Sequence, residues 1–185
     1  MSARLRGVLG STTMVVIPLI VLAGSIAIVA TMGGPQILRE KLGSAGLMGS
    51  IVVHALLNLT PAGELVPSSV ANGALFGVST GACVNWTGWM LAALFQYGAG
   101  RRLGGSAQSV DPLERTPRWL RRWPVDHLAF QVLGRSVPWV GIHGTNLASG
   151  WLRIPFPRFL IGAALGLVGP ALAMAAAGAG LFRLL

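Results

Sequence analysis

Two ionisable side chains stand inside or beside long apolar stretches, where a charge is costly to bury and is commonly functional. Glu64 immediately precedes residues 65–100, which contain no Asp, Glu, Lys or Arg. Desolvation favours the protonated form of a carboxyl group, so Glu64 could take up and release a proton. Arg135 stays charged, and its planar guanidinium suits a phosphate. The alternatives are that Glu64 snorkels to the outer surface and that Arg135 anchors a helix at the cytoplasmic rim.

Two histidines, His54 and His143, lie one in each of two apolar stretches, residues 44–59 and 128–150. Because histidine titrates where a proton gradient acts, the pair could form a relay with Glu64; the alternative is that each is a hydrogen-bonded packing residue. The chain has no nucleophile motif, phosphate-binding loop, paired catalytic carboxylates or His/Cys metal spacing. We therefore predict a protein that is not an enzyme and uses no cofactor or metal.

The composition is that of an integral membrane protein. Hydrophobic residues make up 53% and charged residues 10% of the 185 residues, and the mean hydropathy is +0.67. Soluble chains carry about 25% charged residues. The net charge of +9 comes mainly from arginines in the connecting segments. Positive charge there sets topology and contacts anionic lipids, so nucleic-acid binding is not expected.

The amino-terminal unit is predicted to be residues 1–43. Residues 7–38 carry no charge, and a run longer than the roughly 7–15 residues of a signal core indicates a retained transmembrane helix. Arg4 and Arg6 before it predict a cytoplasmic amino terminus. Residues 36–42 predict a short interfacial helix on the far side of the membrane.

A first re-entrant hairpin is predicted after this unit. Residues 44–59 are apolar, but as a helix at 1.5 Å per residue they reach only about 24 Å. We therefore expect them to turn back inside the bilayer, with a return arm that contains residues 67–72, Pro67 among them. Residues 73–98 then predict a glycine-rich spanning helix. Glycines spaced four apart would align on one of its faces for close packing. They are Gly73, Gly77 and Gly81.

The second half repeats this order. Arginines crowd residues 101–126, which predicts a cytoplasmic basic loop. Residues 128–150 are too polar for a lipid-facing span and predict a second re-entrant hairpin, and residues 159–181 a conventional span. Pro61 lies twelve residues before Gly73, as Pro138 does before Gly150.

The matching offsets favour a duplicated, inverted repeat with a site at its interface, although chance is the alternative. The predicted fold is thus an all-α membrane protein. It is a polytopic helical bundle with two re-entrant helical hairpins arranged as an inverted repeat, and residues 44–185 form its main domain.

An ordered set of residues resembles the DedA superfamily, also called the VTT or SNARE-associated domain, over about residues 44–170. The first block is residues 67–77, followed along the chain by Gly81, Gly88, Phe95, Arg101, Gly134, Arg135, Pro138, Asn146, Gly150, Arg158, Gly166 and Pro170. The sequence is most similar to the scramblase-like branch, whose second motif has Pro three, Asn eleven and Gly fifteen residues after the arginine.

The resemblance implies a pair of re-entrant hairpins and lipid transport. Eukaryotic members act as phospholipid scramblases, and bacterial members are implicated in returning the polyprenyl-phosphate carrier across the membrane with the proton gradient. Glu64 corresponds to an acidic residue of the first hairpin and Arg135 to the first arginine of the second. A second arginine of the bacterial type is replaced here by Gly141, and no second acid occurs in the first hairpin, which makes passive scrambling more plausible.

We therefore expect a lipid transporter or scramblase that moves a phospholipid or polyprenyl phosphate between leaflets, with proton coupling left open. The alternatives are a non-transporting membrane scaffold and an ion or proton channel. The expected location is the bacterial inner membrane, with several crossings, and homo-oligomerisation stays open. The expected substrate-path residues are Glu64, Arg135, Pro67, Pro138, Asn146, His143 and His54, and the expected packing residues are Gly73, Gly77, Gly81 and Gly150.

Overall fold

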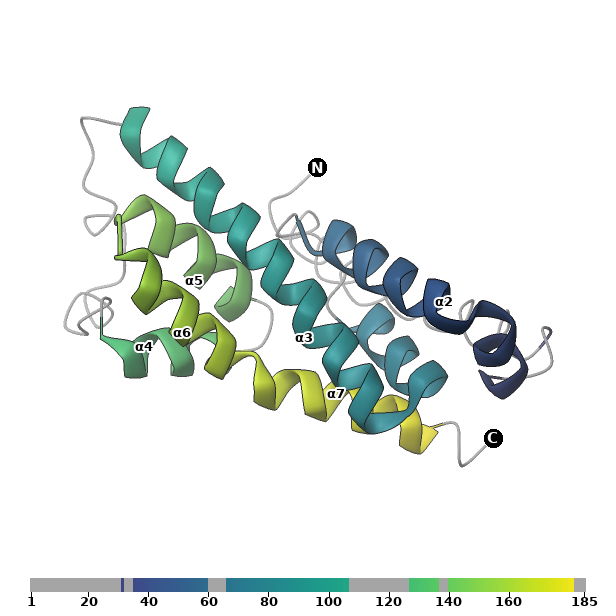
Figure 1. The fold of residues 1–185 in the computed structure, drawn as a ribbon. Helices are drawn as coiled ribbons and strands as arrows, with labels where there is room; N and C mark the ends of the chain where they lie inside the picture. The colour runs from purple at the N-terminus through teal and green to yellow at the C-terminus, as the bar shows by residue number, and fades with distance from the viewer. Residues whose placement is uncertain (1–30, 32–34, 60–65, 107–126, 137–139, 182–185) are drawn as a thin grey trace, which may run out of the picture.

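The computed structural model describes residues 31, 35–59, 66–106, 127–136 and 140–181, and in this part of the chain all regular structure is helical. The elements are α2 (Pro35–Leu57), α3 (Pro67–Ser106), α4 (Leu128–Leu133), the 3₁₀ helix η3 (Gly134–Ser136), α5 (Val140–Trp151), α6 (Phe156–Gly166) and α7 (Val168–Leu181). Figure 1 shows α3 running diagonally through the molecule, with α2 on one side and α6 and α7 on the other. The all-α prediction is confirmed for these residues.

The long helix α3 is two helices joined at a break. It contains 40 residues, and Gly77 inside it has φ 79° and ψ 177°. That conformation is open to glycine and rare for other residues. The chain turns back there, so that Gly81 rests against the backbone of Asn72 and Gly73.

This break corrects the prediction of a single packing face. Gly73, Gly77 and Gly81 do not lie along one uninterrupted helix, because Gly77 lies at the break between the other two. The return arm and the glycine-rich helix were expected to meet at Gly73, and they meet at Gly77 instead. A similar break at Gly43 (φ 50°, ψ −143°) interrupts α2, at the boundary predicted between an interfacial helix and the first hairpin.

Backbones approach closely where α3 meets α7. A Cβ added at Gly73 would collide with the backbone of Ala175, and one added at Gly178 would collide with that of Val70. Small residues allow this approach, which gives van der Waals contact where lipid removes the usual hydrophobic driving force. The first turns of α3 are thereby fixed against the last turns of α7.

The same kind of contact fixes α5 on the second part of α3. A Cβ at Gly150 would collide with the carbonyl of Tyr97, and one at Gly100 with that of Leu147. Tyr97 stacks on Phe159 with 4.4 Å between ring centroids, and its hydroxyl donates to the Ile154 carbonyl at 2.7 Å. These contacts tie α3, α5 and α6 into one core.

The outward faces are apolar. Phe156–Leu181, formed by α6 and α7, is long and apolar enough to cross a membrane, and the other described helices fall short of that combination. Its exposed side chains include Ile161, Leu165, Val168 and Leu172, and those of α2 include Met48, Val52, Val53 and Leu56. Large apolar side chains are thus exposed on the outer faces in addition to those that form the buried core, which is typical of a surface that meets lipid or another protein.

Candidate functional site

Beside the apolar core, the interior of the helical assembly contains a large set of buried polar side chains. They come from α2, α3, α4, η3 and α5, and none is more than 5% exposed. Because water cannot reach these groups, their hydrogen bonds must come from one another or from the backbone. The buried polar residues are His54, Asn58, Ser69, Asn72, Asn85, Gln96, Gln131, Arg135, His143, Asn146 and Ser149.

Arg135, at the middle of η3, is the charged member of this set and is 1% exposed. Its Nε and Nη2 donate to Asn146 Oδ1 at 3.1 and 2.9 Å, and its Nη1 donates to Gln131 Oε1 at 3.2 Å and also to the Gln131 carbonyl. The guanidinium carbon lies 5.3 Å from the centre of the Phe159 ring. The partners of this buried cation are therefore amide oxygens and an aromatic face.

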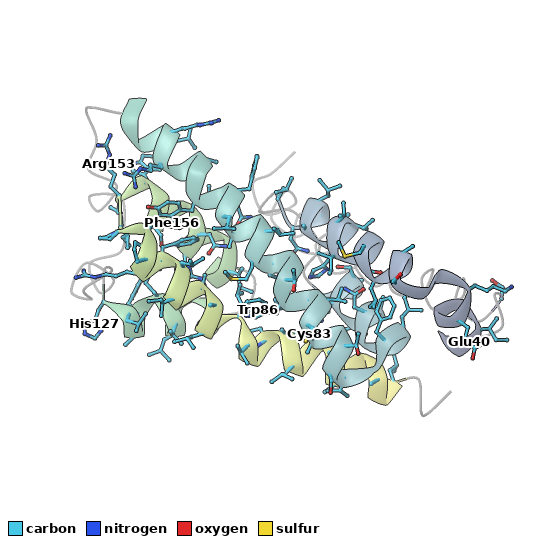
Figure 2. The ribbon with its side chains drawn as sticks, in the orientation of Figure 1. Glu40, Cys83, Trp86, His127, Arg153 and Phe156 are labelled. Carbon is cyan, nitrogen blue, oxygen red and sulfur yellow. The ribbon has the colours of Figure 1, made fainter. Side chains whose placement is uncertain are left out.

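No carboxylate contacts Arg135 among the described residues. Their one acid is Glu40, which is exposed on α2. Figure 2 shows Glu40 at the opposite end of the molecule from Phe156, which precedes the Arg135 contact residue Phe159 on α6. Amide oxygens satisfy guanidinium donors but leave the positive charge uncompensated, so the site retains an attraction for an anion.

The side-chain amides of Asn146 and Gln131 hold Arg135 between them and are called the amide clamp. A chain of hydrogen bonds, called the amide network, continues from this clamp through the molecule. Asn146 Nδ2 donates to Gln96 Oε1 at 2.9 Å, and Gln96 Nε2 donates to the Asn58 carbonyl at 2.8 Å. The same Nε2 lies 2.7 Å from His143 Nδ1. Four elements, η3, α5, α3 and the end of α2, are thus joined by buried amides.

Gln131 closes the other side of the clamp. Its Oε1 accepts from Ser149 Oγ at 2.9 Å as well as from Arg135, and the side chain of Gln131 lies against Gly162 of α6. Neither Gln131 nor Gln96 is among the site residues predicted from the sequence. The signal that could have found Gln96 is its spacing from Asn85, since positions eleven apart share a helix face.

His54 lies in a separate part of the interior, between α2 and α3. Its Nδ1 is 2.7 Å from Ser68 Oγ, and its ring centre is 5.5 Å from that of Trp89. The ring lies over Gly88, where a Cβ would be 2.7 Å from its Cδ2. One turn later, Asn58 Nδ2 donates to the His54 carbonyl at 2.8 Å.

The structure brings some predicted residues together and leaves others apart. Arg135, Asn146 and His143 belong to one network through Gln96. The imidazole of His54 contacts Ser68 instead, and His54 reaches the network through its backbone carbonyl and Asn58. Pro67 is buried at the start of α3. The two remaining predicted site residues, Glu64 and Pro138, lie outside the described residues.

Several buried polar atoms have no partner in the described part of the chain. They are His54 Nε2, Asn58 Oδ1, Trp89 Nε1 and His143 Nε2. A buried polar atom without a partner costs about 1–3 kcal/mol, so each is a place where a water or ligand atom would be stabilised. Within the same residues there is no group of three or more His, Cys, Asp or Glu side chains able to hold a metal.

Comparison with known protein families gives a match over most of the chain. The family described as VTT domain matches residues 64–180, which include Gln96, Gln131, Arg135, His143 and Asn146 and all of α6 and α7 but the last residue. Neither the curated proteins nor the solved structures contain a match.

Proposed function

The chain belongs to the VTT domain (DedA) family of membrane-associated, transporter-like and generally non-enzymatic proteins, and we propose that it moves a phosphate-bearing lipid between the two leaflets. The substrate is a phospholipid or a polyprenyl phosphate, and Arg135 is its phosphate ligand. The observation that carries the proposal is the guanidinium buried among neutral amides. A lipid phosphate is the anion that a membrane protein meets at highest concentration.

Phosphate oxygens can replace the amide oxygens as the hydrogen-bond acceptors of Arg135. Asn146 Oδ1 and Gln131 Oε1 occupy the guanidinium edges that a phosphate would take with two parallel hydrogen bonds. A hydrogen bond between two charged groups is roughly twice as strong as a neutral one. A phosphate that reaches the site can therefore displace the amides, and the amides can recapture the cation when the lipid leaves.

The structure is a closed state in this proposal, because Arg135 is 1% exposed. A lipid crosses with its headgroup in a polar path and its tails in hydrocarbon, so a narrow groove beside η3 suffices. Opening would separate η3 from α6, where Gly166 lies 3.2 Å, measured from an added Cβ, from Arg135 Cδ.

Two reciprocal sets of contacts support an inverted repeat of hairpin and span. In the first set, α2 packs on α3 with His54 over Gly88, and α4 packs on α6 with Gln131 over Gly162. In each half, the helix that leads into the hairpin, α2 or α4, thus contacts the following long helix of the same half through a polar residue that lies over a glycine. One turn after these polar residues come Asn58 and Arg135, which both reach the amide network.

In the second set, each return arm packs on the helix of the other half. The first turns of α3 contact α7 at Gly73 and Ala175, while α5 contacts the second part of α3 at Gly150 and Tyr97. An inverted repeat with its site at the midplane requires that the two halves pack on each other in this way. We propose that both hairpins are re-entrant, since polar breaks at membrane depth persist where protein satisfies them.

The rest of the proposal concerns topology and the remaining residues. The protein is a multi-pass protein of the bacterial inner membrane with a cytoplasmic amino terminus, and its partners are lipids with phosphate headgroups. Glu64 modulates the charge of the path, or is protonated, during passage. The polar side chains His54, His143 and Asn146 line that path, and Pro67 and Pro138 break its hairpins.

Lipid exchange in liposomes tests the proposal. Purified protein is reconstituted with a fluorescent phospholipid, and leaflet exchange is followed by chemical quenching from outside. Arg135→Met should slow exchange by at least roughly tenfold, the equivalent of one charge-assisted bond. Arg135→Lys, which keeps the charge and loses the fork, should retain part of the rate. The matched control is Arg102→Met, which removes an exposed arginine from α3 and should leave exchange unchanged.

The rival functions give different results in the same liposomes. A channel would carry current without exchanging lipid, and a scaffold would do neither. Exchange by the Arg135→Met protein at the wild-type rate, with both the fluorescent phospholipid and a polyprenyl phosphate, would refute the role of the guanidinium.

A further inference from the structure

The hydrogen-bond chain from Arg135 to His143 has a fixed direction. A guanidinium has only N–H donors, so the atom of Asn146 that meets Arg135 Nε and Nη2 must be the oxygen, Oδ1. The amide nitrogen of Asn146 then points the other way, toward Gln96. Since Asn146 Nδ2 donates at 2.9 Å, the atom of Gln96 that it meets must be the oxygen, Oε1.

A second, independent contact fixes Gln96 in the same orientation. Its nitrogen Nε2 lies 2.8 Å from the Asn58 carbonyl and 3.2 Å from that of Leu59. Backbone carbonyls only accept, so this end of the amide must be the donor. The other N–H of Nε2 faces His143 Nδ1 at 2.7 Å. Because an amide nitrogen does not accept, His143 Nδ1 must be the acceptor, and its proton must sit on Nε2.

We propose that Asn146 and Gln96 form a polarity relay that keeps His143 neutral, with its proton on Nε2, for as long as Arg135 is held by the amide clamp. A doubly protonated imidazole would place an Nδ1–H against an N–H of Gln96. Turning the Gln96 amide over would place its oxygen against the Asn58 carbonyl and its nitrogen against Asn146 Nδ2. Turning Asn146 as well would aim N–H groups at the guanidinium.

Protonation of His143 and retention of Arg135 in the clamp therefore exclude each other. Gln96 and Asn146 are positioning residues here, since neither needs to touch a lipid. If the proposed function holds, uptake of a proton at His143 Nδ1 frees Arg135 for a phosphate. When the amides bind Arg135 again, His143 Nδ1 releases that proton to water. The relay itself depends only on donor and acceptor chemistry.

Among the charged side chains around α5, Arg135 is the one that hydrogen bonds within the described part of the chain join to the His143 ring. No described acid stands near enough to favour an imidazolium, because Glu40 lies at the far end of α2 (Figure 2). The titratable or charged groups on the elements around α5 are Cys83, Tyr97, Arg101 and Arg102 of α3, Arg158 of α6, Arg135 of η3, His54 of α2, and Arg153, which follows α5.

The test reads the proton position directly. The chain has three histidines, so nitrogen-15 NMR of histidine-labelled protein in lipid nanodiscs gives few signals, and the signal lost in His143→Phe identifies His143. We expect a neutral ring with Nε2 protonated and Nδ1 bare at neutral pH. A ring protonated on Nδ1 in the wild-type protein would overturn the relay.

A pair of variants separates the relay from a general effect of charge. Gln96→Glu puts an acceptor opposite His143 Nδ1 and should move a proton onto that nitrogen. Gln131→Glu is the matched control, since it makes the same change on the other side of Arg135 without contact to His143 in the described network, and it should leave the proton on Nε2.

The two variants are expected to respond differently only if the relay exists. An unchanged His143 signal in folded Gln96→Glu protein, or the same shift in both variants, would contradict the relay. Failure of lipid exchange in liposomes would leave these spectra as they are, so the two proposals fail separately.

Discussion

Replacement of Asn146 by leucine removes the main support of the buried charge. Asn146 is fully buried, and the variant removes the oxygen that accepts from Arg135 Nε and Nη2 together with the donor to Gln96 Oε1. Leucine has the same number and branching of side-chain heavy atoms but larger methyl groups, and the comparison variant Asn72→Leu carries the same change of volume. Hydrogen bonds to charged groups contribute about 1.5–3 kcal/mol, and removing one partner of a buried charge costs about 3–5 kcal/mol.

Neutral hydrogen bonds between membrane helices are weaker, at about 0.6 kcal/mol on average. We therefore expect Asn146→Leu to lower the free energy of unfolding by about 3 kcal/mol, and Asn72→Leu by about 1 kcal/mol. Asn72 is a fair comparison because it is also buried and donates to the neutral Asn85 Oδ1 at 2.9 Å. Reversible unfolding in mixed micelles of lipid and denaturing detergent measures both.

The double variant shows whether the charge is the cause. Removing the charge with Arg135→Met in the Asn146→Leu background should restore at least about 2 kcal/mol, because replacing both partners of a buried polar pair is often near neutral. A cost for Asn146→Leu no greater than that for Asn72→Leu would refute the reasoning. So would strict additivity of the two changes.

Three further predictions concern the backbone and the core. Gly178→Leu should destabilise the α3–α7 contact by about 2–3 kcal/mol in the same unfolding assay, whereas Gly180→Leu, with open space around it, should change little. Gly77→Ala should cost about 1–2 kcal/mol because of its positive φ, while Gly98→Ala, in a helix interior with nothing within 4 Å, should stabilise by about 0.5–1 kcal/mol. Tyr97→Phe loses the bond to the Ile154 carbonyl and the acceptor for Arg101 Nη1, and should cost about 1–3 kcal/mol. Gly178→Leu or Gly77→Ala as stable as its control, or Tyr97→Phe as stable as the wild-type protein, would contradict these assignments.

The sequence predicted the members of the site better than their partners. Arg135, His143 and Asn146 stood out because each is polar in an apolar stretch, and the structure joins them in one network. Gln96 and Gln131 carry as many of the hydrogen bonds. Gln96 lies in the glycine-rich helix α3 and Gln131 in the apolar helix α4, and a neutral amide in either place resembles a packing residue. The role of such an amide depends on which side chains of neighbouring helices face it, and the spacing of residues along the chain does not specify those side chains.

The position of the helix break was also beyond the sequence. Several glycines between residues 73 and 88 could adopt a positive φ, and the local sequence does not rank them. Tertiary contacts decide, because Gly73 is fixed against Ala175 and must stay helical, while Asn72 must reach Asn85 on the returning segment. Gly77 is the position between them that has space around it.

The choice of amides in place of a carboxylate around Arg135 accounts for both proposals. A carboxylate would neutralise the guanidinium and compete with any arriving phosphate, whereas an amide oxygen satisfies its donors and leaves the charge available. A carboxylate also has two equivalent oxygens, so it transmits no direction to its neighbours. An amide has a donor end and an acceptor end, and once Arg135 takes the oxygen of Asn146, the orientation of Gln96 and the proton position on His143 follow.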